Sequence, residues 1–354
     1  MTQAIQHTAE MLAKAAVSGE PMVVARVVEV EGFSTLPVDE IVAVDGQGQV
    51  FGDLLGIPGA EAMAPAARDL IDSDQPRLAT VHVTVGGSAV SELGLACGGR
   101  VGILLQPASC VPAQTWTAIA ARAPVALVTV VDGPASGPDA LAVYWDGSTA
   151  GSLGSAVAEM PGGSGTALAD SLVAEAIGML KEAATARRRV TTEAGTAMIE
   201  AWVPSPRLVV VGAGDVVGAI DAQAGLLGWE VRSVPDHEGV DEMLEWAGAT
   251  AALIVLSHDP HVDVPALAAG LRRPIPYIGA MGSRHTQSRR IERLASSGVG
   301  AGDLERIHRP IGLDLGGRRA PEVALAIAAE IQAVLHHRDA RSLRDSSGPI
   351  HQAG

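Results

Sequence analysis

The segment RLVVVGAGDVVGAI at residues 207–220 constrains the fold of this chain more than any other stretch. A short apolar run that enters a glycine-rich turn and then a helical pattern is typical of the strand, turn and helix that open a Rossmann-type βαβ unit. Beyond it, apolar strand patterns alternate with helical patterns up to about residue 336. This alternation predicts a parallel sheet with crossover helices, hence a C-terminal Rossmann-like domain at 205–338. The polar segment 339–354 is expected to be a disordered tail.

The N-terminal half carries a different pattern, and this pattern occurs twice. A proline-led, valine-rich strand, a β-hairpin and a helix occupy about 21–85 and again about 123–195. The Asp-Gly turns of the two hairpins, at Asp45 and Asp146, lie at nearly equal spacing from the start of each copy. Chance similarity of two hairpins is the alternative, because such turns are common. We predict a duplicated α+β hairpin-helix domain over residues 1–204.

Composition limits the classes of partner. The chain has 354 residues and a net charge of -15, so its surface should repel nucleic acid and anionic lipid. It has two cysteines, too few for a disulfide framework, and no uninterrupted apolar run of membrane-spanning length. The N-terminal residues are polar and amphipathic, without the apolar core of a secretory signal. We therefore expect a cytoplasmic protein that neither spans a membrane nor binds nucleic acid.

The sequence Cys97-Gly98-Gly99-Arg100 is the most unusual local feature of the N-terminal half. Two residues without side chains leave room for a bulky planar ligand to approach the thiol and the backbone amides, and Arg100 adds a cation. A small buried thiol followed by a turn or bulge is the alternative. Cys110 lacks such neighbours and is expected to be an ordinary packing residue.

The glycine turn departs from the full dinucleotide-binding pattern. Gly212 and Gly214 are present, but Val217 occupies the position of the third glycine. Asp215 is expected to cap the amides of its own helix and to repel a pyrophosphate. Asp236, about twenty residues further on, is suited to hold a ribose 2′-hydroxyl of NAD. Both a nucleotide site and a Rossmann scaffold kept for folding or dimerisation remain open.

Two other segments follow predicted strands of this domain. The first, SHDPHVD at 257–263, contains histidines and aspartates, but no wider ligand set accompanies them, so we predict a turn and no metal site.

The second segment, GAMGSRHTQSRRIERL at 279–294, opens a basic helix. Ser283 is a candidate N-cap, and Arg284 beside it would bind an anion together with the helix amides. The arginines further along the helix are expected to lie on a solvated face.

Taken together, these segments resemble the XdhC/CoxI family of xanthine dehydrogenase accessory factors. The resemblance rests on LGLACGGRV, SHDPHVD, YIGAMGSRHTQSRRIERL and IHRPIGLDLGGRRAPEVALAIAAEI, and it extends over nearly the whole chain. It implies a protein that binds molybdenum cofactor (molybdopterin) and passes it to xanthine dehydrogenase or a related molybdenum hydroxylase. Under this resemblance Cys97 contacts the cofactor, with Gly98, Gly99 and Arg100 around it, and Ser283 and Arg284 hold a phosphate.

The chain also departs from the family pattern. It has FGDLLGIPG at 51–59 where many members carry a glycine-cysteine motif, and it has Asp215 and Val217 in the glycine turn. The alternative function is an NAD(P)-dependent oxidoreductase that uses the glycine turn, with His258 or His261 as a base. We favour a cofactor-binding chaperone without catalytic residues, which forms a homodimer.

Overall fold

The computed structural model describes residues 3–32, 40–73, 76–86, 98–134, 136–158, 160, 164–181, 185–192 and 195–345. Contacts divide the chain into two compact units, with the boundary between Pro204 and Ser205. Each unit is described by itself.

The N-terminal unit contains two antiparallel five-stranded sheets of the same topology. The strand orders are β3-β2-β1-β5-β4 and β8-β7-β6-β10-β9. The first sheet contains β1 (Met22–Glu31), β2 (Ile41–Asp45), β3 (Val50–Phe51), β4 (Ala79–Val85) and β5 (Gly99–Pro107). The second contains β6 (Val125–Asp132), β7 (Ala140–Tyr144), β8 (Thr149–Gly151), β9 (Ala186–Thr192) and β10 (Gly195–Trp202).

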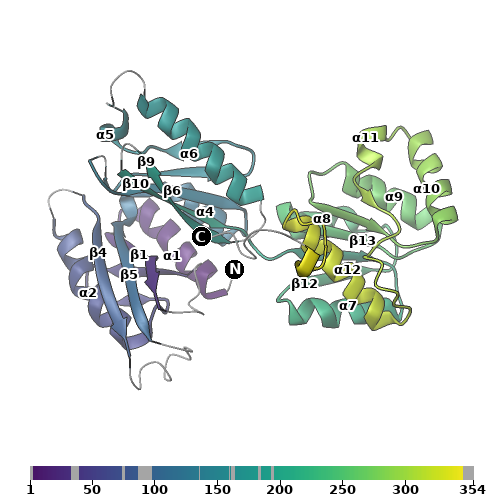
Figure 1. Ribbon diagram of the computed structural model, residues 1–354, viewed down its shortest axis with the longest axis horizontal. Helices are drawn as coiled ribbons and strands as arrows, with labels where there is room; N and C mark the ends of the chain where they lie inside the picture. The colour runs from purple at the N-terminus through teal and green to yellow at the C-terminus, as the bar shows by residue number, and fades with distance from the viewer. Residues whose placement is uncertain are drawn as a thin grey trace. The chain divides into compact units, whose positions relative to one another are not determined.

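Helices cover both faces of these sheets (Figure 1). The outer face of each sheet packs on one long helix, α2 (Gly56–Ile71) or α6 (Ser164–Lys181). The inner faces of both sheets pack on α1 (Gln3–Ser18) and α4 (Ala113–Ala120), which also contact each other. Because β1 and β6 are buried on both faces, they read as nearly continuous valine-rich runs.

The repeat is longer in the structure than its sequence pattern indicates. Each copy begins with an inner helix, α1 or α4. Each copy ends with β5 or β10, which is its last strand in the chain and the fourth across its sheet. The strand after Cys97, which the sequence pattern leaves between the two copies, is therefore a component of the first copy. The short elements η1 (Ala108–Cys110) and α5 (Ser155–Ala158) complete the unit.

A buried charged network joins the two sheets. Arg26 in β1 is fully buried, and its Nη1 lies 2.9 Å from Oε2 of Glu200 in β10. Arg26 also donates a hydrogen bond to the side chain of Gln106 in β5, and Gln106 donates to the carbonyl of Pro138. Arg187 in β9 approaches the other oxygen of Glu200 at 3.1 Å. Ion pairs this deeply buried require such additional partners, because desolvation of each charge is costly.

The C-terminal unit is a parallel five-stranded sheet with the order β12-β11-β13-β14-β15. Its strands are β11 (Arg207–Val211), β12 (Glu230–Val234), β13 (Ala251–Val255), β14 (Tyr277–Ala280) and β15 (Ile307–His308). Its helices are α7 (Asp215–Leu226), α8 (Val240–Ala247), α9 (Pro260–Leu271), α10 (Arg284–Ser296), α11 (Ala301–Leu304) and α12 (Ala320–Leu335). The short elements η3 (Gly248–Thr250) and η4 (Leu343–Asp345) complete it.

Helices α8 to α11 share one hydrophobic core with β11, β13 and β14, whereas α7 packs against α12 (Figure 1). If the five strands are numbered by their order in the chain, their order across the sheet is 2-1-3-4-5. The direction of strand addition therefore reverses between β11 and β13. Ligands of open α/β sheets bind at such a reversal, outside the carboxyl ends of the strands.

The fold class predicted from the sequence is confirmed, as two antiparallel sheets followed by a Rossmann-like parallel sheet. The sequence analysis missed α4 and α11, which are short. No helix among the described residues is long and apolar enough to cross a membrane. Residues 346–354 of the expected tail lie outside the described residues.

Candidate functional site

The candidate site is the carboxyl edge of the Rossmann-like sheet, where β11, β12, β13 and β14 end. Gly212 and Gly214 follow β11 with φ angles of 135° and 103°, a region that side chains rarely adopt. A Cβ on Gly212 would lie 3.1 Å from Cβ of Leu256, which follows the neighbouring β13. The turn therefore needs glycine both for its backbone angles and for its close approach to the next strand.

Gly214, and not Asp215, occupies the N-cap position of α7. No side chain caps this helix, and Asp215 is exposed in its first turn. The expected self-capping by Asp215 is therefore wrong, because its carboxylate lies one residue too far into the helix. A residue at the first helical position cannot fold back onto the amides that an N-cap side chain reaches.

Asp236 lies at the same edge as the glycine turn. Strands β11 and β12 pair in parallel with Val211 opposite Val234, and the Gly212 amide donates to the Val234 carbonyl at 2.9 Å. Asp236, two residues further on, is half-buried and accepts a hydrogen bond from the Glu238 amide at 2.8 Å. The structure thus brings Gly212, Gly214 and Asp236 to neighbouring strand ends.

Ser283 and Arg284 follow β14, two strands away from the glycine turn. Ser283 is the N-cap of α10, as expected, and accepts a hydrogen bond from the Thr286 amide at 3.2 Å. Arg284 is exposed and lines a pocket of about 500 Å³ along α10, which Arg309 also lines. An exposed guanidinium beside a helix N-terminus is an arrangement that binds anions.

The arginine further along α10 is not where the sequence pattern predicted it. Arg290 is almost fully buried, and its Nε and Nη2 bind Oδ2 of Asp263 in α9 at 2.8 and 2.7 Å. It also donates to the carbonyls of Ser257 and Met281, which follow β13 and β14.

Gln287, one helical turn before Arg290, is buried as well. It accepts from Arg290 at 2.7 Å and donates to the Ala280 carbonyl at 2.9 Å. Gln287, Arg290 and Leu294 share one helical face through spacings of three and four residues, but two of them are polar, so this spacing does not by itself indicate burial. The solvated face expected for the later arginines is thus wrong for Arg290, which holds two strand-end loops together.

The segment after β13 forms a cap. The carboxylate of Asp259 accepts the His261 amide at 2.9 Å and caps α9, while Asp263 binds Arg290. Within the described ranges no group of three or more histidines, cysteines, aspartates or glutamates could hold a metal ion. His258 and His261 are exposed at the same edge.

The N-terminal candidates lie in the other unit. Cys97 falls outside the described residues. Gly98 is exposed, Gly99 begins β5, and Arg100 is exposed opposite Glu31 and Thr84 of the flanking strands. A Cβ on Gly32 at the end of β1 would lie 3.0 Å from the Gly98 carbonyl oxygen, so the backbones are in close contact here.

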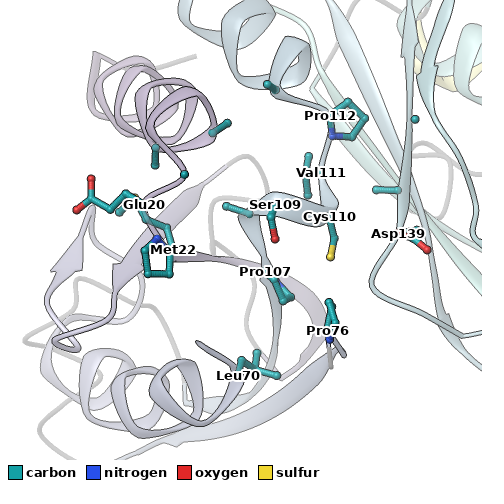
Figure 2. Close-up of a pocket in the computed structure, with 18 of the residues that line it drawn as sticks. Glu20, Met22, Leu70, Pro76, Pro107, Ser109, Cys110, Val111, Pro112 and Asp139 are labelled. Carbon is teal, nitrogen blue, oxygen red and sulfur yellow. The ribbon is translucent and has the colours of Figure 1, made fainter. Parts of the chain in front are cut away.

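Sequence analysis missed a cavity of about 830 Å³, which lies in the N-terminal unit (Figure 2). Cys110, expected to be a packing residue, is half-buried and lines this cavity beside Ser109. Burial raises the pKa of the Cys110 thiol, and nearby Asp139 adds to this, against a hydrogen bond from Ser109 that lowers it. No local signal could have revealed the cavity, because five separate segments of the chain line it.

Fold and site together define an α/β protein with a Rossmann-like unit. Comparison with known proteins gives a family match for this unit. Residues 208–331 match the family model described as the XdhC Rossmann domain. The match covers most of the Rossmann-like unit and none of the N-terminal unit.

Two curated relatives come from Escherichia coli strain K12. Uncharacterized protein YqeB is 27% identical over 261 residues, which are 64% of this chain and 46% of the relative. Molybdenum cofactor insertion chaperone PaoD is 32% identical over 88 residues, which are 25% of this chain and 28% of the relative. The chain thus spans less than half the length of either relative.

A crystal structure described as a xanthine dehydrogenase from Bacillus halodurans aligns with 96% of this chain and 98% of its own. The identity is 18% and the TM-score 0.47. A likeness at this level carries no information on function.

Proposed function

We propose that this protein binds molybdenum cofactor and assists its insertion into xanthine dehydrogenase or a related molybdenum hydroxylase. The observation that carries the proposal is the XdhC Rossmann domain, part of a chain that shares 32% identity over 88 residues with a molybdenum cofactor insertion chaperone. Binding and delivery require a ligand site and a partner surface but no general base. We therefore assign no catalytic residue.

The anionic end of the cofactor fits the start of α10. Gly282, with a φ of 139°, precedes the N-cap, and a Cβ there would lie 3.3 Å from Cβ and Cγ2 of Thr286. Ser283 shapes the turn, and Arg284 supplies a positive charge with no ion pair to any described residue. A phosphate would be held by helix amides and guanidinium together.

The N-terminal candidates form a separate candidate site for the cofactor, within their own unit. Gly98 and Gly99 present backbone groups without a Cβ, and Arg100 adds a second exposed cation. The proposal assigns Cys97 as a thiol that contacts the cofactor, since thiolate sulfur is a soft ligand for such metal sites. When bound, the cofactor would bring the molybdenum chemistry that the client enzyme uses.

The test is purification without oxygen from cells that make molybdenum cofactor, followed by measurement of bound pterin by fluorescence after oxidation. We expect near-stoichiometric pterin in the native chain and a loss of about tenfold in Cys97→Ala and in Arg284→Ala. Arg289→Ala is the matched control, because Arg289 is exposed on the same helix, one turn further on. Absence of pterin from the native protein would overturn the proposal.

A nicotinamide nucleotide is the second candidate ligand. The observation in its favour is that Gly212, Gly214 and Asp236 meet beside the reversal of strand order. Under this candidate the protein is an NAD(P)-dependent oxidoreductase, with His258 or His261 as the base. Titration of the native chain and of Asp236→Asn with NAD tests this candidate. An NAD-linked enzyme must bind NAD, and the substitution must lower its affinity for NAD.

A further inference from the structure

We infer that the cavity of the N-terminal unit is a second binding site, which takes a small organic cation with a flat apolar body. The inference does not rest on the proposed function, because no described residue assigned to molybdenum cofactor lines the cavity. Its size, charge and walls each contribute to the inference.

The cavity has the dimensions of a small-molecule site. Its volume of about 830 Å³ falls within the usual range for such pockets, about 300–1,000 Å³. It is bounded by the turn between α1 and β1, the end of α2, the η1 turn after β5, and the β7–β8 hairpin. All of these segments belong to one unit, so the cavity does not depend on the placement of the Rossmann-like unit.

The charge of the cavity selects the ligand. Among the described residues that line it, Glu20 and Asp139 are the only ionisable ones besides Cys110, and none is a lysine, arginine or histidine. Neither carboxylate forms an ion pair with a described residue. Figure 2 shows them on either side of the Ser109–Cys110 turn. Two unpaired carboxylates disfavour a phosphate and attract a cation, so the cofactor of the proposed function is the wrong ligand here.

The walls suit a flat apolar body. Four prolines line the cavity, together with Met22 and Leu70. Rigid apolar walls with a few polar groups are the usual lining of small-molecule sites. Ser109 and the uncharged Cys110 thiol supply hydrogen-bonding groups between the two carboxylates.

Cys110 provides a readout inside the cavity. The sequence contains two cysteines, so Cys97→Ala leaves Cys110 as the single thiol of the full-length chain. The probes are proflavine, a flat cation, and 9-anthracenecarboxylate, a flat anion of similar size. We expect proflavine to slow alkylation of Cys110 by N-ethylmaleimide about fivefold and the anion to slow it less than about twofold.

Charge-neutral variants separate this site from nonspecific dye binding. Glu20→Gln with Asp139→Asn should abolish the protection by proflavine, and both residues are exposed, so the fold should tolerate the change. The matched control is Asp221→Asn with Glu242→Gln, which neutralises two exposed carboxylates of the other unit. In this control proflavine should still protect Cys110. If the alkylation of Cys110 proves too slow, fluorescence titration with proflavine measures the affinity of the cavity for this probe. Equal protection by both probes, no binding, or binding unchanged in Glu20→Gln/Asp139→Asn would each overturn the inference.

Discussion

Gln106 and Glu200 occupy equivalent positions in the two copies of the N-terminal repeat, and both bind the guanidinium of Arg26. Gln106 pairs with Val24, the third residue of β1, and Glu200 pairs with Leu127, the third residue of β6. The position equivalent to Arg26 in the second copy is Thr129, which is also fully buried. The duplicated module is therefore symmetric in its backbone topology and asymmetric in the charged side chains at its centre.

Removal of one partner from this centre should be costly. Glu200→Leu leaves Arg26 buried without its carboxylate, and we expect a loss of about 3–5 kcal/mol in the free energy of unfolding. Urea denaturation followed by tryptophan fluorescence measures it, since Trp116 and Trp202 are buried in this unit. The double change Arg26→Met/Glu200→Leu should be less harmful than the single one, because no charge is left unpaired.

The control for this prediction is a second ion pair, made by the arginine that follows Arg187 in β9. Arg188, next to Arg187, pairs with Glu175 of α6, and solvent reaches both side chains of this pair. Glu175→Leu should have a much smaller effect, since exposed pairs contribute about 0–1 kcal/mol. Equal losses in Glu200→Leu and Glu175→Leu would show that burial of the pair is not what matters.

Arg290 should control the order of the strand-end loops at the candidate site. Arg290→Lys keeps the charge but cannot reproduce the forked contacts to Asp263 and to the Ser257 and Met281 carbonyls. We expect faster hydrogen exchange at residues 256–259 and 281–284, with helix α12 unchanged. Exchange rates in these loops equal to those of the native protein would contradict the role assigned to Arg290.

Glu330 should contribute stability that depends on pH. Burial raises the pKa of its carboxyl group, but hydrogen bonds from His308, Tyr277 and the Gly312 amide outweigh burial, so the pKa lies below its usual 4.5. A carboxyl group with a lowered pKa in the folded state stabilises the fold above its unfolded pKa, and this contribution is lost as the pH falls through the folded value.

Glu330→Gln tests this contribution. The variant should be about 1–2 kcal/mol less stable than the native protein at pH 7, because hydrogen bonds to a charged acceptor are replaced by neutral ones. The difference in unfolding free energy should shrink steadily on acidification below pH 4.5. A difference that is constant across this pH range would show that Glu330 acts through packing alone.

The Ser283 cap should matter for helix α10 independently of any ligand. Ser283→Ala removes the acceptor of the Thr286 amide, and we expect a loss of about 1 kcal/mol in stability. Ser283→Asp should restore stability, because aspartate also caps. The same aspartate should weaken anion binding at Arg284, since it places a negative charge at the helix N-terminus. Thermal unfolding and the pterin measurement separate the two effects, and a stable variant with unchanged pterin would argue against an anion site here.

Much of the C-terminal unit could be predicted from the sequence, because short apolar strand runs alternate there with glycine turns and helix starts that are visible locally. The apolar run that opens segment 207–220 is β11 (Arg207–Val211), and the alternation predicted up to about residue 336 ends with α12 (Ala320–Leu335). Ser283 was recognised as an N-cap because capping depends on residues within one helical turn. The repeat of the N-terminal half was visible for the same reason, through its hairpins and their Asp-Gly turns.

The tertiary structure alone decided the place of β5, the pairing of Arg26 with Glu200, the burial of Arg290 and the cavity around Cys110. Arg26 and Glu200 lie 174 positions apart in the chain, and neither carries a local sign of its partner. A buried arginine has the same sequence appearance as a solvated one until its carboxylate is placed beside it. Local periodicity determines elements because neighbours in sequence are neighbours in space, whereas buried charges and cavities arise only where distant segments meet.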